Sequence, residues 1–267
     1  MKTIFITGSS SGLGKAAVKL FAAKGWKVIA TMRHPEKETE LKEIKNVVLL
    51  PLDVTSPESI KDTVEKSIAI GVDVVFNNAG YGLGGALESY SEEQITSQLN
   101  TNLLGVILTT QAFIPYFRAK KEGLFLTTTS IGGRITFPFY SVYCATKWGV
   151  EGFCESLAFE LNEFGIGVKT IAPGGISSSF RNSSDNAYHD AYSTLFDKVI
   201  DTFRSGRTPT ILSSPEQIAA VVYEAATDGK EQLRYEAGED ARTYVAQRLQ
   251  KGAETFRKDM AGLFFGS

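Results

Sequence analysis

The sequence has few cysteines and no long apolar run. It contains 2 cysteines in 267 residues, and its longest clear apolar stretch, Val47–Leu52, is far shorter than the roughly 18 residues of a membrane span. Cys144 and Cys154 stand ten positions apart (154 − 144) in one predicted helix, about 15 Å along its axis, which is too far for a disulfide. Strand-like residues directly after Met1 leave no room for a secretory leader. We therefore expect two reduced thiols, no membrane span and a cytoplasmic location.

An excess of charge of either sign is also missing. The 28 Lys and Arg residues nearly balance the 30 Asp and Glu residues, so nothing indicates a nucleic-acid partner. Hydrophobic residues make up 43% of the chain, which is enough for a large core and excludes a disordered or fibrous protein. Since single α/β domains often reach about 250 residues, we expect one domain over residues 1–267.

Short β-branched runs alternate with amphipathic stretches along most of the chain. Strands are predicted at Lys2–Thr7, Lys27–Thr31, Val47–Leu52, Val72–Asn77, Gly123–Ser130 and Val168–Ala172. Helices are predicted from Leu13 to Gly25, from the N-cap Ser56 to Gly71, over Glu92–Ala119 and Tyr143–Phe164, and from the capping box Ser214–Gln217 to Thr227. Interleaving of this kind predicts a single doubly wound α/β (Rossmann) domain, with a parallel central sheet and helices on both faces.

The segment from Gly175 to Leu212 differs from the rest of the chain. It is rich in Ser, Asn, Phe and Tyr and has weak periodicity. It is either a surface insertion or a lid over a site. Long irregular loops in compact domains tend to be functional, so we interpret residues 175–212 as a substrate lid.

A glycine-rich loop separates the first predicted strand from the first predicted helix. It runs from Thr7 to Gly14 with the spacing Gly-x-x-x-Gly-x-Gly. Glycines also mark ordinary turns, but between a strand and a helix they let backbone amides approach a pyrophosphate at the positive helix end. The loop residues that we expect to bind a dinucleotide are Gly8, Ser10, Ser11, Gly12, Leu13 and Gly14.

The end of the second predicted strand bears on the choice of dinucleotide. An NAD-specific fold usually places an acidic residue here to bind the ribose 2′-hydroxyl, whereas this chain has Met32 and Arg33. A guanidinium can pair with the 2′-phosphate of NADP through a charge-assisted fork. The alternative is a solvated surface arginine. The position favours NADP as the cofactor, and His34 is expected to be exposed or near the adenine.

Tyr143 and Lys147 are four positions apart on one helical face. Tyrosine is a poor base at neutral pH because its ordinary pKa is about 10. A nearby lysine ammonium, together with an oxidised nicotinamide, would lower that pKa by stabilising the phenolate. Tyr-x-x-x-Lys alone arises often by chance, but Ser130 ends a predicted strand at the sheet edge where ligands bind. The Ser130 hydroxyl could therefore hold a substrate oxygen beside Tyr143.

With these motifs, the sequence resembles the short-chain dehydrogenase/reductase superfamily over most of its length. The resemblance implies that Asn102, Ser130, Tyr143 and Lys147 are catalytic, and that Tyr143 and Lys147 also contact the cofactor. Asn102 is matched through Asn102-Leu103-Leu104-Gly105. The resemblance also implies cofactor contacts from Asp53 and Val54, from Asn78, Ala79 and Gly80 in Asn-Asn-Ala-Gly, and from Pro173, Gly174, Ile176 and Ser178. In the last motif Ser178 replaces the usual threonine. No metal is implied.

Two stretches resemble the NADP-dependent branch that contains 17-beta-hydroxysteroid dehydrogenases and retinol-type reductases. They are Ala30–Arg33 and Gly132–Arg134 with Phe137-Pro138. The family implies hydride transfer between nicotinamide and a carbonyl or secondary alcohol carbon, and assembly as a homodimer or homotetramer through the two long helices. Whether the C-terminal residues Leu263–Phe265 dock on their own chain or on a neighbouring subunit stays open.

Aromatic residues suggest the substrate. Phe137, Phe139, Phe180, Tyr188, Tyr192 and Phe196 fall in segments that the family places around the pocket. They would suit an apolar ketone or aldehyde, or they pack the lid against the body. Arg134 and Arg181 are the candidates for anchoring an anionic substrate.

A non-catalytic NADP(H)-binding redox sensor of the same fold is the alternative function. A nucleotide-sugar epimerase is disfavoured, because such an enzyme needs a longer substrate domain than the 267 residues of this chain leave room for.

Overall fold

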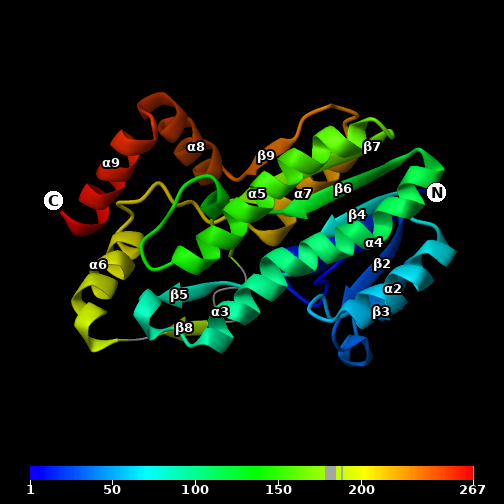
Figure 1. Ribbon diagram of the computed structural model, residues 1–267, viewed down its shortest axis with the longest axis horizontal. Helices are drawn as coiled ribbons and strands as arrows, with labels where there is room; N and C mark the ends of the chain where they lie inside the picture. The colour runs from blue at the N-terminus through cyan, green and yellow to red at the C-terminus, as the bar shows by residue number, and fades with distance from the viewer. Residues whose placement is uncertain (178–184, 188, 267) are drawn as a thin grey trace.

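The computed structural model describes residues 1–177, 185–187 and 189–266. Its centre is a parallel sheet of seven strands in the order β3-β2-β1-β4-β6-β7-β9 (Figure 1). The strands are β1 (Thr3–Ile6), β2 (Lys27–Met32), β3 (Val47–Pro51), β4 (Val74–Asn77), β6 (Gly123–Thr128), β7 (Ile166–Pro173) and β9 (Arg234–Ala237). The order reverses between β1 and β4, and ligands bind outside the carboxyl ends of the strands at such a switch point.

The sheet forms from strands that are buried on both faces. Every residue of β1 and of β4 is buried. Parallel pairing runs from Thr3 with Lys27 on one side of β1 to Ile4 with Val74 on the other. Continuous apolar strands without alternation are typical of parallel sheets covered by helices on both sides. The predicted α/β fold is thereby confirmed.

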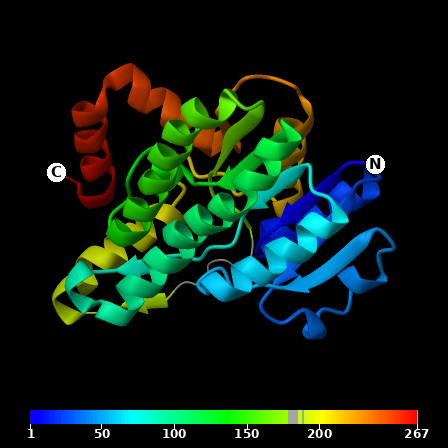
Figure 2. The ribbon, with the colours of Figure 1, turned by 45° about the vertical axis from the view of Figure 1, so that its right-hand side comes forward.

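Helices cover each face of the sheet. α1 (Gly12–Ala23) and α7 (Pro215–Thr227) pack over one face, while α2 (Pro57–Ile70), α4 (Gly105–Lys120) and α5 (Ser141–Asn162) cover the other (Figures 1 and 2). Each layer has its own apolar cluster, with Phe21 and Val222 in the first and Phe113 and Leu157 in the second. The sheet is therefore held between two cores.

Two helix starts agree with their sequence signals. Ser56 caps α2 by accepting a hydrogen bond from the Ser59 amide. Ser214 and Gln217 form the predicted capping box of α7. These side chains satisfy amides that a helix leaves without intrahelical partners.

The helix predicted over Glu92–Ala119 is present, but a π-helical turn interrupts its α-helical geometry. The structure divides this stretch into α3 (Glu92–Leu99), a π-helical turn over Asn100–Leu104, and α4. A π turn inserts a residue without ending the helix, so it leaves the apolar pattern of the sequence nearly continuous.

Segment 175–212 holds more regular structure than its weak periodicity indicates. β8 (Asp185–Ala187) pairs with β5 (Leu83–Gly85) in a separate parallel sheet of two strands, and α6 (Ser193–Arg204) follows. Ile176 forms a bridge to Ser213, which brings the two ends of the segment together. The strands are three residues long and made of Leu-Gly-Gly and Asp-Asn-Ala, which are mostly poor strand formers.

The C-terminal residues dock on their own chain. They form α8 (Glu239–Lys251) and α9 (Ala253–Phe265), which the sequence left unassigned. Phe264 is buried and packs against Phe203 of α6, in a cluster that also contains Tyr244 and Phe256. The tail thus contacts the chain's own body through Phe264.

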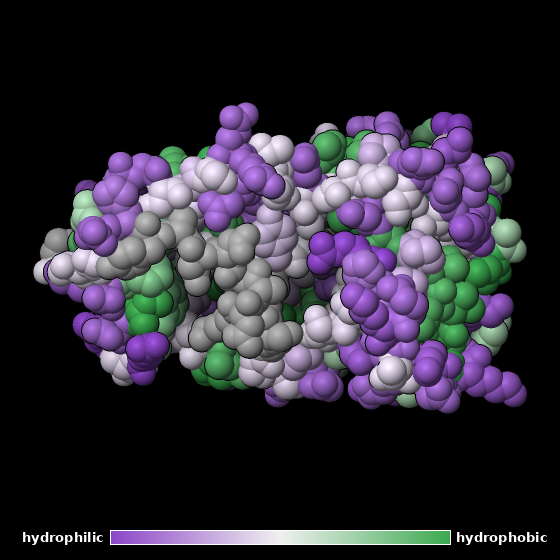
Figure 3. All heavy atoms as spheres, turned by 90° about the horizontal axis from the view of Figure 1, so that it is seen from below, coloured by the Kyte–Doolittle hydropathy of each residue, from purple (hydrophilic) through white to green (hydrophobic). Residues whose placement is uncertain are grey.

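The cysteines lie where the predicted helix spacing places them. Cys144 and Cys154 are both free and buried in α5. Among the described residues, no helix is long and apolar enough to cross a membrane. Figure 3 shows polar side chains over much of the face seen from below, with hydrophobic residues in separate patches between them.

Candidate active site

Three polar side chains meet near the carboxyl end of β6. Ser130 follows this strand, and Tyr143 and Lys147 lie one turn apart in α5. The Ser130 side chain hydrogen-bonds Tyr143, and Lys147 Nζ lies 5.9 Å from the centroid of the Tyr143 ring. The structure thus brings together the serine, tyrosine and lysine that the sequence singles out.

The Lys147 ammonium is held by the backbone of β6. Its Nζ donates a hydrogen bond of 3.0 Å to the Thr128 carbonyl oxygen, and Lys147 is buried. Gly133 lets the chain after β6 pack closely on the α5 backbone, since an added Cβ there would lie 2.8 Å from the Lys147 carbonyl oxygen. Lys147 is therefore a fixed cation beside Tyr143.

Asn102 is buried in the π-helical turn. Its Nδ2 donates to the Tyr81 carbonyl oxygen at 2.8 Å, and its Oδ1 accepts from the Tyr81 amide at 3.1 Å. A Cβ on Gly80 would lie 3.1 Å from Asn102 Oδ1 and 3.8 Å from Lys147 Nζ, so Gly80 lies between the two. The Asn102 side chain is therefore held by both backbone groups of Tyr81.

Burial governs the protonation of both α5 side chains. It raises the pKa of the Tyr143 phenol above its ordinary value, against the opposing hydrogen bond of Ser130. Burial lowers the pKa of Lys147 to about 8, and the Glu151 carboxylate opposes this shift. The protein's own groups therefore do not produce the lowered Tyr143 pKa that we expect from Lys147 and an oxidised nicotinamide. At neutral pH, Tyr143 is a protonated donor beside a mostly charged Lys147.

Glycines shape the loop between β1 and α1. Gly8 and Gly12 have φ angles of 67° and 52°, in the left-handed region that favours glycine. A Cβ on Gly14 would lie 2.2 Å from the Gly8 carbonyl oxygen, and one on Gly8 would lie 2.7 Å from Ala79 Cα. The loop is thus packed tightly on itself and on the end of β4.

The first turn of α1 is open to an anion. Ser11 stands at its N-cap without a side-chain hydrogen bond to the helix, unlike Ser56, Ser91 and Ser214 at α2, α3 and α7. This turn contains no acidic residue, and Ser10 and Ser11 are exposed. Uncapped amides at the positive end of a helix attract phosphate groups. The residues present therefore fit the pyrophosphate of a dinucleotide.

Asn78 connects three strand ends. Its Nδ2 lies 3.1 and 3.2 Å from the Thr7 and Gly8 carbonyl oxygens, and its Oδ1 accepts from Thr128 Oγ1 at 3.2 Å. Thr7 Oγ1 accepts from the amides of Asn78 and Ala79, both at 2.9 Å. Sequence reasoning missed the parts played by Thr7 and Thr128, although Thr7 opens the glycine motif and could have been noticed there.

Arg33 and Asp53 lie beyond the ends of β2 and β3. Arg33 is exposed, and Asp53 is half-buried. The Thr55 hydroxyl lowers the pKa of Asp53 most, against burial, and the Arg33 charge adds to the lowering. Val54 packs on the start of α4, where a Cβ on Gly105 would lie 2.8 Å from the Val54 carbonyl oxygen. Arg33 and Asp53 are thus within electrostatic range of each other.

The loop after β7 is fixed by a buried carboxylate. Pro173 ends β7, and a Cβ on Gly174 would lie 2.0 Å from Asp240 Oδ1 in α8. The Gly175 amide donates to Asp240 Oδ2 at 2.7 Å, just before the bridge formed by Ile176. The start of the predicted lid is therefore anchored at the sheet edge.

The predicted aromatic residues have two sets of ring contacts. Phe139 packs on Tyr192 and Phe196, with ring centroids 6.2 and 5.4 Å apart. Phe137 packs on Tyr244 at 5.9 Å and on Phe203 of α6 at 6.1 Å. Phe137 and Phe139 both pack against the apolar cluster that contains Tyr244, so these rings join segment 175–212 to the body as well as being candidates for the substrate wall. Ser178, Phe180, Arg181 and Tyr188 lie outside the described residues.

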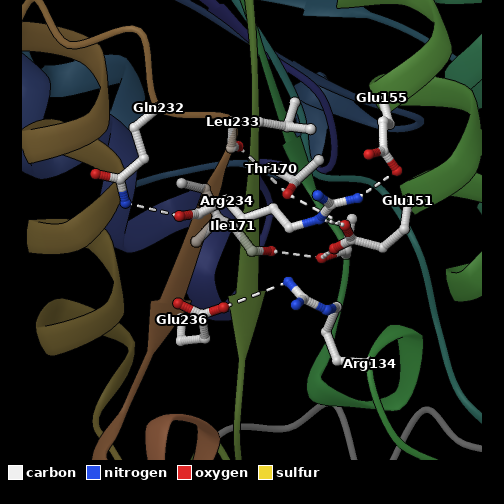
Figure 4. Close-up of polar contacts among 10 residues, drawn as sticks. Arg134, Glu151, Glu155, Thr170, Ile171, Gln232, Leu233, Arg234 and Glu236 are labelled. Carbon is white, nitrogen blue, oxygen red and sulfur yellow. Dashed lines mark hydrogen bonds and ion pairs between the residues drawn. The ribbon is translucent and has the colours of Figure 1, made fainter. Parts of the chain in front are cut away.

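Two charged residues considered from the sequence are already paired. Arg134 lies 3.3 Å from the Glu236 carboxylate (Figure 4), so an anionic substrate would compete with that ion pair. His34 is exposed and lies 3.2 Å from Glu36. Neither residue is a strong candidate for holding a ligand.

The fold is that of a doubly wound α/β protein, and comparison with known proteins identifies the family. The family model of the short chain dehydrogenases matches residues 2–189. An uncharacterized oxidoreductase of Schizosaccharomyces pombe is 38% identical over 229 residues, 84% of this chain and 96% of that protein. The 17-beta-hydroxysteroid dehydrogenase type 1 of Homo sapiens is 32% identical over 255 residues, 87% of this chain and 76% of that protein. A solved short-chain dehydrogenase from Streptomyces avermitilis has a TM-score of 0.83 at 29% identity, covering 98% of this chain and 96% of that one. The chain therefore belongs to the short-chain dehydrogenase family and is an oxidoreductase.

Proposed function

We propose that the chain is an NADP(H)-dependent reductase that transfers hydride to the carbonyl carbon of an apolar ketone or aldehyde. The observation that carries the proposal is the meeting of Ser130, Tyr143 and Lys147 near the carboxyl end of β6. The raised pKa of Tyr143 supports reduction as the direction, because a protonated phenol is the form that donates a proton.

The nicotinamide, when bound, supplies the hydride, and the chain supplies orientation and proton transfer. Ser130 holds the carbonyl oxygen, and the Tyr143 hydroxyl donates a proton to that oxygen. Lys147 stabilises the resulting phenolate and binds the nicotinamide ribose. A water held by Asn102 resupplies the proton through Lys147.

The cofactor would lie across the carboxyl ends of the strands. Its pyrophosphate fits the uncapped start of α1, at Gly12, Leu13 and Gly14. We assign Asp53 and Val54 to the adenine, and the remaining contacts to the residues named for it in the sequence: Gly8, Ser10, Ser11, Asn78, Ala79, Gly80, Pro173, Gly174, Ile176 and Ser178.

Replacing Arg33 by alanine is expected to reverse or erase a preference for NADPH over NADH. The Arg33 side chain is exposed at the end of β2, where a guanidinium would pair with the 2′-phosphate. A hydrogen bond to a charged group is worth about 1.5–3 kcal/mol, so kcat/KM for NADPH should fall on the order of tenfold to a hundredfold. The test is to measure kcat/KM with NADPH and with NADH in the wild type and in Arg33→Ala. A wild-type preference for NADH, or an unchanged ratio, contradicts the assignment.

A screen of NADPH oxidation with diverse ketones and aldehydes tests the activity itself. Turnover of apolar carbonyls supports the proposal. The alternative is a non-catalytic NADP(H)-binding redox sensor, which would bind NADPH tightly and turn over none of them. The assembled serine, tyrosine and lysine favour the enzyme, because a sensor has no use for a proton donor at this place.

Substrate, assembly and location follow as lesser parts of the proposal. Phe139, with Tyr192 and Phe196 of segment 175–212, would form an apolar wall beneath a lid. Phe159 on α5 is 77% exposed, which suits assembly as a homodimer or homotetramer through the long helices. Light scattering tests this, and a monomer would contradict it. The two free thiols suit a cytoplasmic location.

A further inference from the structure

A buried glutamate continues the active-site face of α5. Tyr143, Lys147, Glu151 and Glu155 follow one another at intervals of four residues, and therefore share one side of the helix. The Glu151 side chain is 5% exposed and that of Glu155 is 51% exposed. A buried carboxylate is costly unless it is paired and hydrogen-bonded, so its partners indicate why it is there.

Glu151 has partners from three strands or strand ends (Figure 4). The Thr129 hydroxyl, just after β6, lies 2.7 Å from Glu151 Oε1 and 3.1 Å from the Ile171 carbonyl oxygen, so the carboxylate is the nearer acceptor for its single proton. Arg234 of β9 donates from Nε to Glu151 Oε2 at 3.0 Å, and the Thr170 hydroxyl of β7 lies 3.5 Å from the same oxygen. Arg234 also binds Glu155 at 2.7 Å. The Glu151 carboxylate is thus fixed between α5 and the sheet.

Three consecutive residues, the last of β6 and the two that follow it, each contact one member of this α5 face. The Thr128 carbonyl oxygen accepts from Lys147, the Thr129 hydroxyl donates to Glu151, and Ser130 hydrogen-bonds Tyr143. The Thr129–Glu151 contact lies between the other two contacts, which belong to the candidate active site. The Thr129 amide donates to the Ile171 carbonyl oxygen of β7 at 2.8 Å, whereas the bond to Glu151 connects Thr129 to α5.

We propose that Glu151 is a positioning residue of this site. Its carboxylate fixes Thr129, and with it Ser130, against α5, and it places a buried negative charge one helical turn from Lys147. The catalytic consequence rests on the proposed function, whereas the effect on Lys147 does not.

The other ionisable groups considered around Lys147 are either neutral or cations paired with other carboxylates, which leaves Glu151 as the negative charge that acts on Lys147. Tyr143 is neutral, because burial raises its pKa. Burial also raises the pKa of the Cys154 thiol to about 12, so Cys154 is neutral too. The Arg234 cation from β9 is shared with Glu155, and Arg134 is paired with Glu236.

The direct test is a titration of Lys147 by nuclear magnetic resonance in the chain without cofactor. Isotope-labelled lysine is used, and the Lys147 signal is identified by its loss in Lys147→Arg. Glu151→Gln keeps an acceptor for Thr129 but removes the charge and leaves Arg234 nearby. Lys147 should then titrate about one pH unit below its wild-type position. Equal titration in wild type and Glu151→Gln overturns the electrostatic part.

Glu155→Gln is the matched control. It removes a carboxylate from the same Arg234, but Glu155 is exposed and one turn farther from Lys147. Its Lys147 titration should match wild type, and a shift equal to that of Glu151→Gln would also overturn the proposal. In turnover, the basic limb of the kcat profile should move to lower pH in Glu151→Gln, because loss of the carboxylate favours deprotonation of Lys147.

The positional part is tested at Thr129 and does not depend on whether Glu151→Gln folds. Thr129→Val removes the hydrogen bond and keeps the Glu151 charge, so kcat should fall on the order of tenfold to a hundredfold with little change in KM for NADPH. Thr129→Ser should restore it. Equal kcat in the two variants overturns the positional part. If the wild type turns over no carbonyl, the proposed function fails. The Lys147 titration still tests the electrostatic effect of Glu151, because it is measured without cofactor or substrate.

Discussion

Replacing Tyr143 by phenylalanine is expected to remove nearly all turnover and to leave NADPH binding intact. The substitution deletes one hydroxyl, which is the proposed proton donor, and keeps the ring. General acid–base catalysis contributes roughly 10²–10⁴-fold, so kcat should fall by about that factor. The edge-on contact between the Tyr143 and Tyr140 rings, whose centroids are 6.2 Å apart, remains available to phenylalanine. The fold should therefore survive the change.

Stopped-flow NADPH oxidation and a fluorescence titration of NADPH separate the two effects. Tyr116→Phe is the matched control, because it also deletes a phenol hydroxyl, one that accepts a hydrogen bond from the Val72 amide. That variant should turn over normally. Near-normal activity of Tyr143→Phe would remove Tyr143 as the acid. A joint loss of NADPH binding would instead indicate a positional role for the hydroxyl.

Six of the seven strands of the central sheet could be predicted because they are short β-branched runs between amphipathic helices. The later elements could not, because their residues carry weak signals. β9 is Arg-Tyr-Glu-Ala, and it becomes a strand only by pairing with β7, where Thr170 lies opposite Arg234. β5 and β8 likewise depend on each other, and a local pattern does not reveal a partner that is far away in the chain.

At the site, residue types and spacing predicted the side chains but not their environment. Lys147 and Tyr143 at i and i+4 are visible in the sequence, whereas the Thr128 carbonyl that holds Lys147 has no sequence signal, since every residue offers a carbonyl. Glu151 continues the same spacing, but a glutamate on a helix is usually solvated. Its burial follows from Arg234, which is distant in the chain.

The direction of the pKa shifts shows the same limit. The charge of Lys147 is evident from the sequence, and alone it would lower the pKa of Tyr143. Burial has the opposite and larger effect, and burial depends on the packing of α5 against the sheet. Sequence alone therefore predicts the reacting groups better than their resting protonation.

Replacing Gly14 by alanine is expected to weaken dinucleotide binding on the order of a hundredfold while the chain still folds. The added Cβ would lie 2.2 Å from the Gly8 carbonyl oxygen and 2.7 Å from Asn78 Nδ2. Since the first of these atoms is backbone, the loop must move. The amide N–H groups at the start of α1 then no longer point toward the pyrophosphate. Each hydrogen bond to a charged group is worth about 1.5–3 kcal/mol, so losing one or two weakens NADPH binding on the order of a hundredfold.

Gly152→Ala is the control that isolates this clash. Gly152 is also helical, in α5, but an added Cβ there meets nothing within 4 Å. Alanine should stabilise that helix by up to about 1 kcal/mol and leave NADPH affinity unchanged. Fluorescence titration gives the Kd, and thermal unfolding gives the stability of both variants. Wild-type affinity in Gly14→Ala would mean that the cofactor does not rest on the glycine loop, whereas lost affinity with a preserved Tm places its phosphates at the start of α1.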